Sequence, residues 1–134
     1  MDYPEVPPKV VARLRPICLG LPDAYEEQAW AGVRWMVRKK TFAHVLAIDE
    51  DSPPVIGRAY RDQPLVMVMF RSEPPELDIL KHIGHPYFAA GWGRNVLGLI
   101  IDKETDWTEV GELLADSYCV MAPKKLAALV IERD

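Results

Sequence analysis

The stretch HPYFAAGWGRNVLGLIIDKETDWTEVGELLADSYCVMAPKKL, residues 85–126, carries the clearest structural signals in the chain. Within it, Val96–Ile101 is a short apolar run with β-branched residues at its far end, which is typical of a buried strand. Asp106 can cap a helix, and Glu109, three residues later, can reach back to close a capping box. The stretch therefore predicts a strand followed by a capped helix.

After that cap, apolar residues recur at three- and four-residue spacing and predict one buried face of the helix. Ser117 lies on this face, where a hydroxyl usually bonds to the helix carbonyl four residues earlier. Pro123 ends the helix and suits the first position of another one. The expected buried residues are Val110, Leu113, Leu114, Ser117, Tyr118 and Met121, followed by Leu126, Leu129 and Val130 on the last helix.

Earlier in the chain, the pattern predicts one helix and then strands. Residues 10–21 repeat apolar side chains at helical spacing until Gly20 and Pro22 stop them. A loop is expected over residues 23–27, and residues 28–38 alternate in polarity as a strand does. Residues 41–49 are predicted to return beside it, with Phe42, His44, Leu46 and Ile48 on one face.

The next segments complete the sheet. Residues 65–71 are almost continuously apolar, which favours a central strand, and residues 73–83 are expected as a short helix or an extended loop. His44, in the middle of an apolar strand, is interpreted as a hydrogen-bonded, half-buried histidine. This order of elements predicts an α+β fold, an antiparallel sheet packed against N-terminal and C-terminal helices.

Length and composition place further bounds on the protein. The chain has 134 residues, 49% hydrophobic and 27% charged, which fits one domain over residues 1–134. Its formal charge of −4 disfavours nucleic-acid binding by bulk electrostatics. Cys18 and Cys119 are far apart and are expected to be free thiols. Without a secretory signal or an apolar run near about 20 residues, we expect a cytoplasmic protein that does not cross a membrane.

Several segments together resemble the MmcQ/YjbR family of small bacterial proteins. They are LPDAYEEQAW, VRKKTFAHV, GWGRNVLGLIID, the Trp107 that starts the long helix, and DSYCVMAPKKL. The resemblance implies a frataxin-like or double-wing sandwich and a name that often carries "DNA-binding" without a defined activity. Iron binding in the frataxin fold implies an acidic first helix, whereas this one carries Lys9, Arg13 and Arg15. Iron is therefore not expected.

The motifs of enzymes are weak or missing. Gly91 and Gly93 lack the third glycine of a dinucleotide fingerprint and precede a strand. None of the serines lies in a Gly-x-Ser-x-Gly elbow. His82 and His85 are separated by a helix-breaking glycine, and no third metal ligand is evident. We expect no catalytic residue, no metal and no cofactor.

The first candidate site is a basic hairpin that can contact the phosphates of double-stranded DNA. Trp30 beside it can stack on a base. The alternative is that these positive charges prevent an exposed sheet edge from pairing with the edge of another sheet. The hairpin residues are Arg34, Arg38, Lys39 and Lys40.

The second candidate site is an aromatic and basic cluster that can hold a small anion or metabolite. Lysines at the start of a helix repel the positive end of the helix dipole. An anion bound beside these lysines would reduce that repulsion. The alternative is that the aromatic rings close the core. The residues are His85, Tyr87, Trp92, Arg94, Trp107, Tyr118 and Lys124.

The leading interpretation is a non-enzymatic binding module that contacts DNA through the basic hairpin. The alternative is a regulatory protein that binds a small anion or metabolite at the aromatic cluster. Apolar residues on both sides of the first predicted strand are compatible with a homodimer as well as a monomer.

Overall fold

The computed structural model describes residues 4–48, 65–89, 93 and 95–131. The six strands in these ranges form one antiparallel sheet in the order β1-β2-β3-β4-β6-β5, which confirms the predicted α+β class. None of the described helices combines the length and apolar character that a membrane crossing requires. The elements are α1 (Pro8–Leu19), β1 (Tyr25–Gln28), β2 (Val33–Val37), β3 (Lys40–Ile48), β4 (Leu65–Arg71), α3 (Glu76–Ile83), β5 (Tyr87–Phe88), β6 (Val96–Ile101), α4 (Trp107–Met121) and α5 (Lys124–Ile131).

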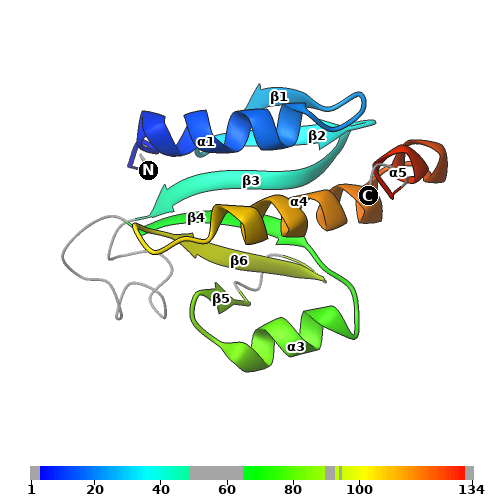
Figure 1. Ribbon diagram of the computed structural model, residues 1–134. Coiled ribbons are helices and arrows are strands. Elements are labelled where there is room, and N and C mark those ends of the chain that lie inside the picture. Colours follow the sequence, from blue (N-terminus) through cyan, green and yellow to red (C-terminus); the bar gives the residue numbers. More distant parts are fainter. Residues whose placement is uncertain (1–3, 49–64, 90–92, 94, 132–134) are drawn as a thin grey trace.

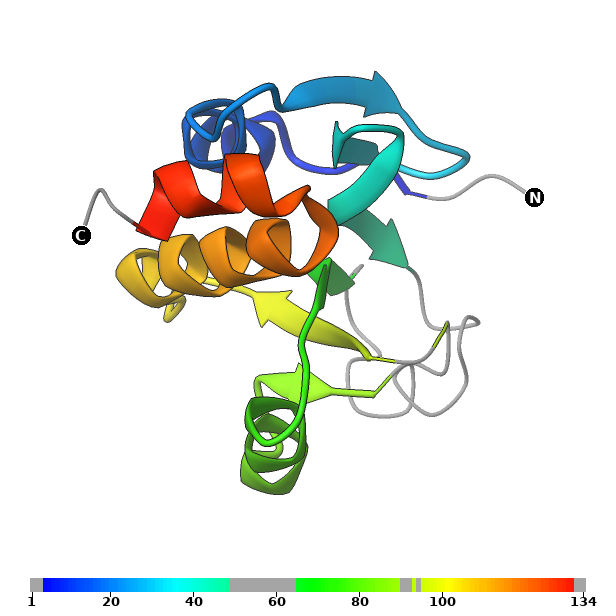
Figure 2. The same cartoon turned by 90° about the vertical axis from the view of Figure 1, so that its right-hand side faces the viewer.

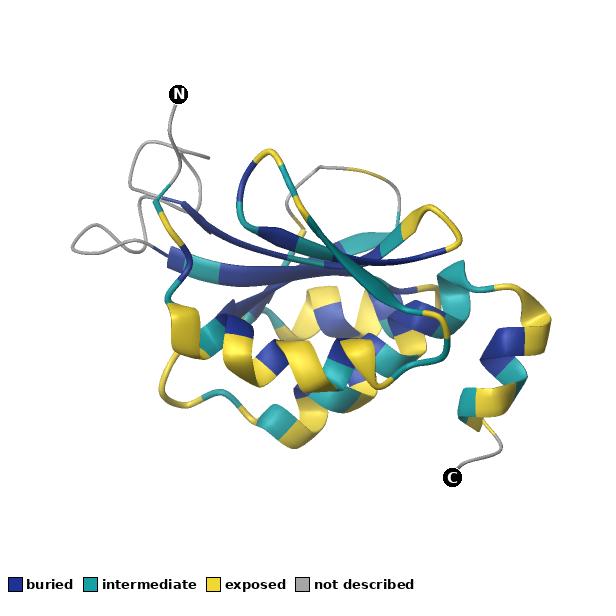
Figure 3. Cartoon of the chain, turned by 90° about the horizontal axis from the view of Figure 1, so that it is seen from above, coloured by how far each residue is buried: buried dark blue, intermediate teal, exposed yellow. Residues whose placement is uncertain are grey.

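Three helices cover one face of the sheet. Figures 1 and 2 show α1 and α4 lying across that face, with α5 beside the end of α4. The core lies between these helices and the sheet, where Leu14, Trp35 and Tyr118 are completely buried. Figure 3 shows the buried residues concentrated along the strands and on the inner faces of the helices. Each such large apolar side chain contributes about 1.5–3 kcal/mol through burial.

Strand β4 is central, as its sequence predicts. It pairs with β3 on one side and β6 on the other. Val68 and Phe70 face the helices, whereas Met67 and Met69 belong to a second buried cluster with Leu46 and other residues. The strand is almost continuously apolar because both of its faces are buried.

The prediction for the region before Val33 is wrong. Residues 25–28 form β1 rather than a loop, and a turn at residues 29–32 divides the predicted long strand. The turn is closed by a 3.1 Å hydrogen bond from the Ala29 N–H to the Gly32 carbonyl. Gly32 has φ +69°, and a Cβ atom there would lie 1.9 Å from the Val45 carbonyl oxygen. Only glycine lets the chain turn this close to β3.

The face predicted for Phe42 is also wrong. Trp35 pairs with Ala43 but Met36 pairs with Thr41, so Phe42 is an extra residue, a β-bulge, in β3. The bulge turns Phe42 towards the helices, where its ring meets the Tyr118 ring edge-on at 5.4 Å between centroids. Leu46 and Ile48 remain together on the other face.

Helix α4 begins as predicted, with one difference. The Asp106 carboxylate accepts from the backbone N–H groups of Thr108 at 3.0 Å and of Glu109 at 3.2 Å. Within the described residues Glu109 does not close the capping box, because its carboxylate accepts a hydrogen bond from the Tyr87 hydroxyl. Pro123 precedes α5, and its carbonyl accepts the first helical hydrogen bonds at 3.0 Å. The predicted buried face of α4 is confirmed at Val110, Leu113, Leu114, Ser117 and Tyr118.

Ser117 connects α4 to the sheet, contrary to the predicted bond within the helix. Its hydroxyl donates to the Phe42 carbonyl at 2.6 Å and accepts from the Arg71 backbone N–H at 2.8 Å. The bulge is the physical reason, because a bulged residue leaves the regular ladder and needs another partner for its carbonyl. One buried hydroxyl therefore bonds to both β3 and β4.

His44 holds the β1–β2 turn against β3. Its Nε2 atom donates to the Ala31 carbonyl at 2.6 Å, and its ring meets the Trp30 ring edge-on at 5.6 Å. Burial lowers the pKa of His44, because the charged imidazolium loses solvation there. The predicted half-buried, hydrogen-bonded histidine is confirmed. Cys18 and Cys119 are also free thiols, as expected.

We expect Ser117→Ala to lower the free energy of unfolding by about 2–4 kcal/mol, because two buried backbone groups lose their partner at about 1–3 kcal/mol each. Urea denaturation monitored by tryptophan fluorescence measures the change. Thr108→Ala, which removes an exposed hydroxyl from the same helix, is the control and should cost under about 0.5 kcal/mol. A loss below about 1 kcal/mol for Ser117→Ala would contradict this role.

We expect His44→Gln to flatten the pH dependence of stability. A histidine whose folded pKa is lowered stabilises the fold above its unfolded pKa, and this contribution is lost as the pH falls through the folded value. Glutamine keeps an N–H donor for Ala31 but does not titrate. The unfolding free energy is measured at about pH 7.5 and about pH 5.5, on either side of the ordinary histidine pKa. From the higher to the lower pH it should drop more for the wild type than for His44→Gln. Equal drops would refute this interpretation.

Candidate functional site

The two arginines of the predicted DNA-binding hairpin are engaged in ion pairs. Arg34 lies opposite Glu27 in the β1–β2 register, with 2.6 Å between Nη2 and Oε1. Arg38 Nη2 lies 3.3 Å from Asp23 Oδ2. Opposite charges on β1, on β2 and in the turns beside them thus offset each other, and less positive charge remains for phosphate groups than the sequence suggested.

The tip of the hairpin presents two lysines. Arg38 and Lys39 have φ of +49° and +67°, as in a two-residue type I′ turn. The Lys39 backbone N–H donates to the Tyr25 hydroxyl at 3.2 Å, while the Lys39 and Lys40 side chains are exposed. Trp30 is not beside this tip. It lies before the start of β2, at the other end of a strand about 16 Å long.

The sequence interpretation missed β1 as the strand that pairs with β2. Because β1 lies outside β2, Arg34 is on the second strand and not at the sheet edge that the alternative interpretation assumed. The sequence does contain a charge pattern that indicates this pairing. The acids Asp23 and Glu27 precede Gly32 and the bases Arg34 and Arg38 follow it, which is the charge pattern of an antiparallel pair.

The aromatic and basic cluster is not gathered around one cavity. Trp92 and Arg94 lie outside the described residues. Trp107 and Tyr118 are on the same helix, separated by eleven residues or about 16 Å. Trp107 packs against the Arg13 guanidinium, 4.7 Å from the ring centroid. The described members are therefore spread over β5, α4 and α5.

The two tyrosines of this cluster belong to the core. The Tyr118 side chain is completely buried and its hydroxyl donates to the Pro22 carbonyl at 2.6 Å. Tyr87 is also buried and donates to Glu109. Burial, followed by the Glu109 hydrogen bond, raises the pKa of Tyr87. For these rings the alternative interpretation, closure of the core, is confirmed. His85 and Lys124 are exposed, before β5 and at the start of α5.

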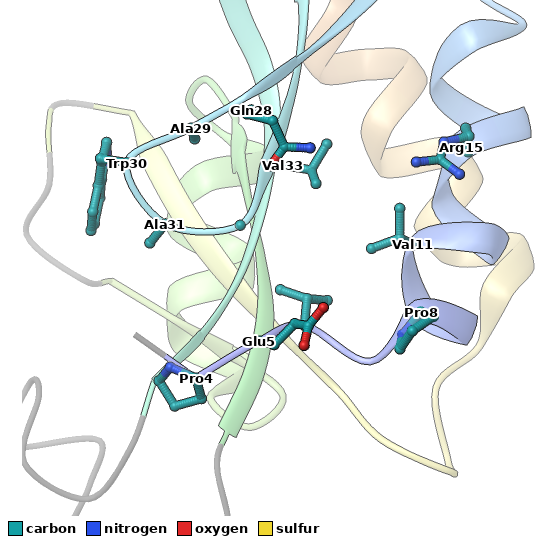
Figure 4. Close-up of a pocket in the computed structure, with 12 residues that line it drawn as sticks. Pro4, Glu5, Pro8, Val11, Arg15, Gln28, Ala29, Trp30, Ala31 and Val33 are labelled. Carbon is teal, nitrogen blue, oxygen red and sulfur yellow. The ribbon is translucent and has the colours of Figure 1, made fainter. Parts of the chain in front are cut away.

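The structure instead shows a cavity of about 610 Å³ between the N-terminal segment, α1 and the β1–β2 turn (Figure 4). We call it the N-terminal cavity. Its floor is apolar, with Val11 from α1 and Val33 from β2 both buried. Its described lining consists of Pro4, Glu5, Val6, Pro8, Val11, Arg15, Gln28, Ala29, Trp30, Ala31, Gly32 and Val33.

Arg15 is the one basic residue among those lining residues, and its charge is already paired. Its Nε and Nη2 atoms donate to the two carboxylate oxygens of Glu26 at 2.8 and 3.0 Å. Trp35 Nε1 donates to the same carboxylate at 2.9 Å. The hydrogen bond from Arg15 lowers the pKa of Glu26. The cavity therefore combines apolar side chains such as Val11 with a larger share of polar surface, which includes the Glu5 carboxylate.

No sequence motif identified the N-terminal cavity. Its residues come from two separate segments, 4–15 and 28–33, that meet only when α1 packs on the β1–β2 hairpin. In the described part of the chain, no three His, Cys, Asp or Glu side chains are grouped as metal ligands.

Comparison with known proteins identifies the family of the chain. A family model described as YjbR matches residues 19–120, well over half of the 134 residues. No curated protein matches the chain. The matched region contains the whole sheet and most of α4. The resemblance seen in the sequence is thus confirmed, and the chain belongs to the YjbR family.

Proposed function

We propose that the protein is a non-enzymatic binding module that holds a small organic molecule in the N-terminal cavity. The observation that carries the proposal is the cavity itself. Its volume of about 610 Å³ lies within the range of about 300–1,000 Å³ typical of ligand sites. Its lining places polar groups beside apolar side chains, so it can both orient a ligand and contact an apolar body.

The lining favours an uncharged or zwitterionic molecule with an apolar body. Val11 and Val33 supply apolar contacts, and Gln28 supplies hydrogen bonds at the rim (Figure 4). An anion would have to compete with Glu26 for Arg15, which makes the small anion expected from the sequence a poorer fit. Among the described lining residues there is no Ser, Thr, Cys, Lys or His, and the carboxylate of Glu5 has no histidine beside it in that lining, which supports binding rather than catalysis.

A thermal-shift screen of uncharged and zwitterionic metabolites tests this function. A ligand at 100 times its Kd should stabilise the fold by about 2.7 kcal/mol. Gln28→Trp, which fills the cavity from the exposed end of β1, should abolish the shift. Lys103→Trp places the same exposed ring in the turn after β6, away from the cavity, and should leave the shift unchanged. A screen without hits, or hits that Gln28→Trp retains, would refute the proposal.

DNA binding is a second candidate function, favoured by one observation. Lys39 and Lys40 are exposed at the hairpin tip and form no ion pair within the part of the chain that the structure describes. Lysines in such a position can contact phosphate groups. Because Arg34 and Arg38 are paired with carboxylates, we expect two phosphate contacts rather than four.

The salt dependence of duplex binding distinguishes these two numbers. Two phosphate contacts predict a slope of log K against log salt of about −1.8, so the affinity for DNA should fall about 12-fold from 50 to 200 mM salt. Four phosphate contacts predict a fall in affinity of roughly 150-fold over the same range. Fluorescence anisotropy with a random duplex measures the slope. Lys39→Gln with Lys40→Gln should abolish binding. The control, Lys124→Gln with Lys125→Gln, removes the same charge from α5. An equal loss of duplex affinity in the two double variants would exclude the hairpin tip as the DNA contact. The absence of binding at low salt would exclude it as well.

A further inference from the structure

A second, smaller cavity of about 250 Å³ lies where the chain leaves β4, passes the start of α3 and faces α4. We call it the α3–α4 cavity. It shares no residue with the N-terminal cavity. Its described lining consists of Phe70, Arg71, Ser72, Glu73, Pro74, Pro75, Glu76, Leu113, Asp116 and Val120.

Hydrogen bonds hold the walls of this cavity in place. The Arg71 N–H donates to Ser117, which is on α4 next to Asp116. The Ser72 N–H donates to the Asn95 carbonyl at 2.9 Å. The end of β4 is therefore tied both to α4 and to the start of β6. A ligand would meet a preformed site, which reduces the entropy lost on binding.

One polar group of the cavity has no partner. Ser72 is 5% exposed, and its hydroxyl forms no hydrogen bond within the described residues. A buried hydroxyl without a partner costs about 1–3 kcal/mol. A serine hydroxyl is re-aimed by rotation about one bond between staggered positions. A ligand with a hydrogen-bonding group would therefore recover this cost.

The charge of the cavity is negative. Among its described lining residues, Glu76 from the first turn of α3, Asp116 from α4 and Glu73 are acidic, whereas Arg71 is the one basic residue. Burial raises the pKa of Glu76, and the nearby Asp116 raises it further. A positively charged ligand would replace the lost solvation of the Glu76 carboxylate and reduce its repulsion from Asp116.

We propose that the α3–α4 cavity binds a small primary amine in its ammonium form. The ammonium group lies between Glu76 and Asp116 and donates to the Ser72 hydroxyl. The alkyl chain packs against Leu113 and Val120. At about 30 Å³ for each water displaced, the 250 Å³ volume accommodates about eight non-hydrogen atoms, and pentylamine with six is a suitable probe.

The test is an NMR titration of the full ¹⁵N-labelled chain with pentylamine, pentanol and pentanoate at one pH and ionic strength. Pentylamine should give saturable shifts in the amides of residues 70–76 and 113–120. The neutral alcohol and the anion of matched chain length should not. Glu76→Gln and Asp116→Asn should each weaken binding about tenfold, equivalent to about 1.4 kcal/mol.

Two further variants separate binding from a structural role. Glu112→Gln removes the same charge from an exposed position of α4 that does not line the cavity, and it should leave the affinity within about twofold. Ser72→Ala should weaken amine binding about fivefold and yet keep or raise the melting temperature, because removing an unpaired buried hydroxyl is not destabilising.

Several results would overturn the proposal. They are the absence of shifts in those two segments, equal binding of pentanol, or equal losses in Glu112→Gln and Glu76→Gln. The N-terminal cavity is lined by other residues, so none of these results would contradict the function proposed for it. That function is tested separately by the thermal-shift screen.

Discussion

The hydroxyl of Ser117 is the contact on which the arrangement of helices and sheet depends. It lies in the core and bonds to β3 through Phe42 and to β4 through Arg71, so it sets the position of α4 along both central strands. The bulge at Phe42 is what makes a carbonyl available for this bond. Tyr118, the next residue, then packs on Phe42 and reaches Pro22. The end of α1 and the sheet are thereby connected to the same turn of α4.

Ion pairing within the first hairpin changes what its basic residues can do. A cation that already faces a carboxylate attracts phosphate less strongly, because the partner offsets its field at short range. Glu27 and Asp23 act in this way on Arg34 and Arg38, and Glu26 does so on Arg15. The basic residues in this part of the molecule therefore hold α1, β1 and β2 together. Within the described β2–β3 hairpin, Lys39 and Lys40 extend beyond those pairs.

Both cavities lie where a helix end meets the edge of the sheet layer. At such places the regular packing of side chains stops, and polar groups remain near apolar walls. In the N-terminal cavity the Arg15 guanidinium is paired with Glu26, whereas the described lining of the α3–α4 cavity has more carboxylates than cations. The two cavities thus differ in charge, which is why we propose different ligands for them.

The sequence by itself determined the fold class, the central strand β4, the strand β6 and the capped helix α4, because hydrophobic period and capping are local properties. It also indicated free thiols and a half-buried His44. Only the tertiary structure decided that β1 exists, that Ser117 bonds to the sheet and that the candidate arginines are paired. These features depend on contacts between residues far apart in the chain, such as the 75 positions between Phe42 and Ser117, and local patterns do not encode such contacts.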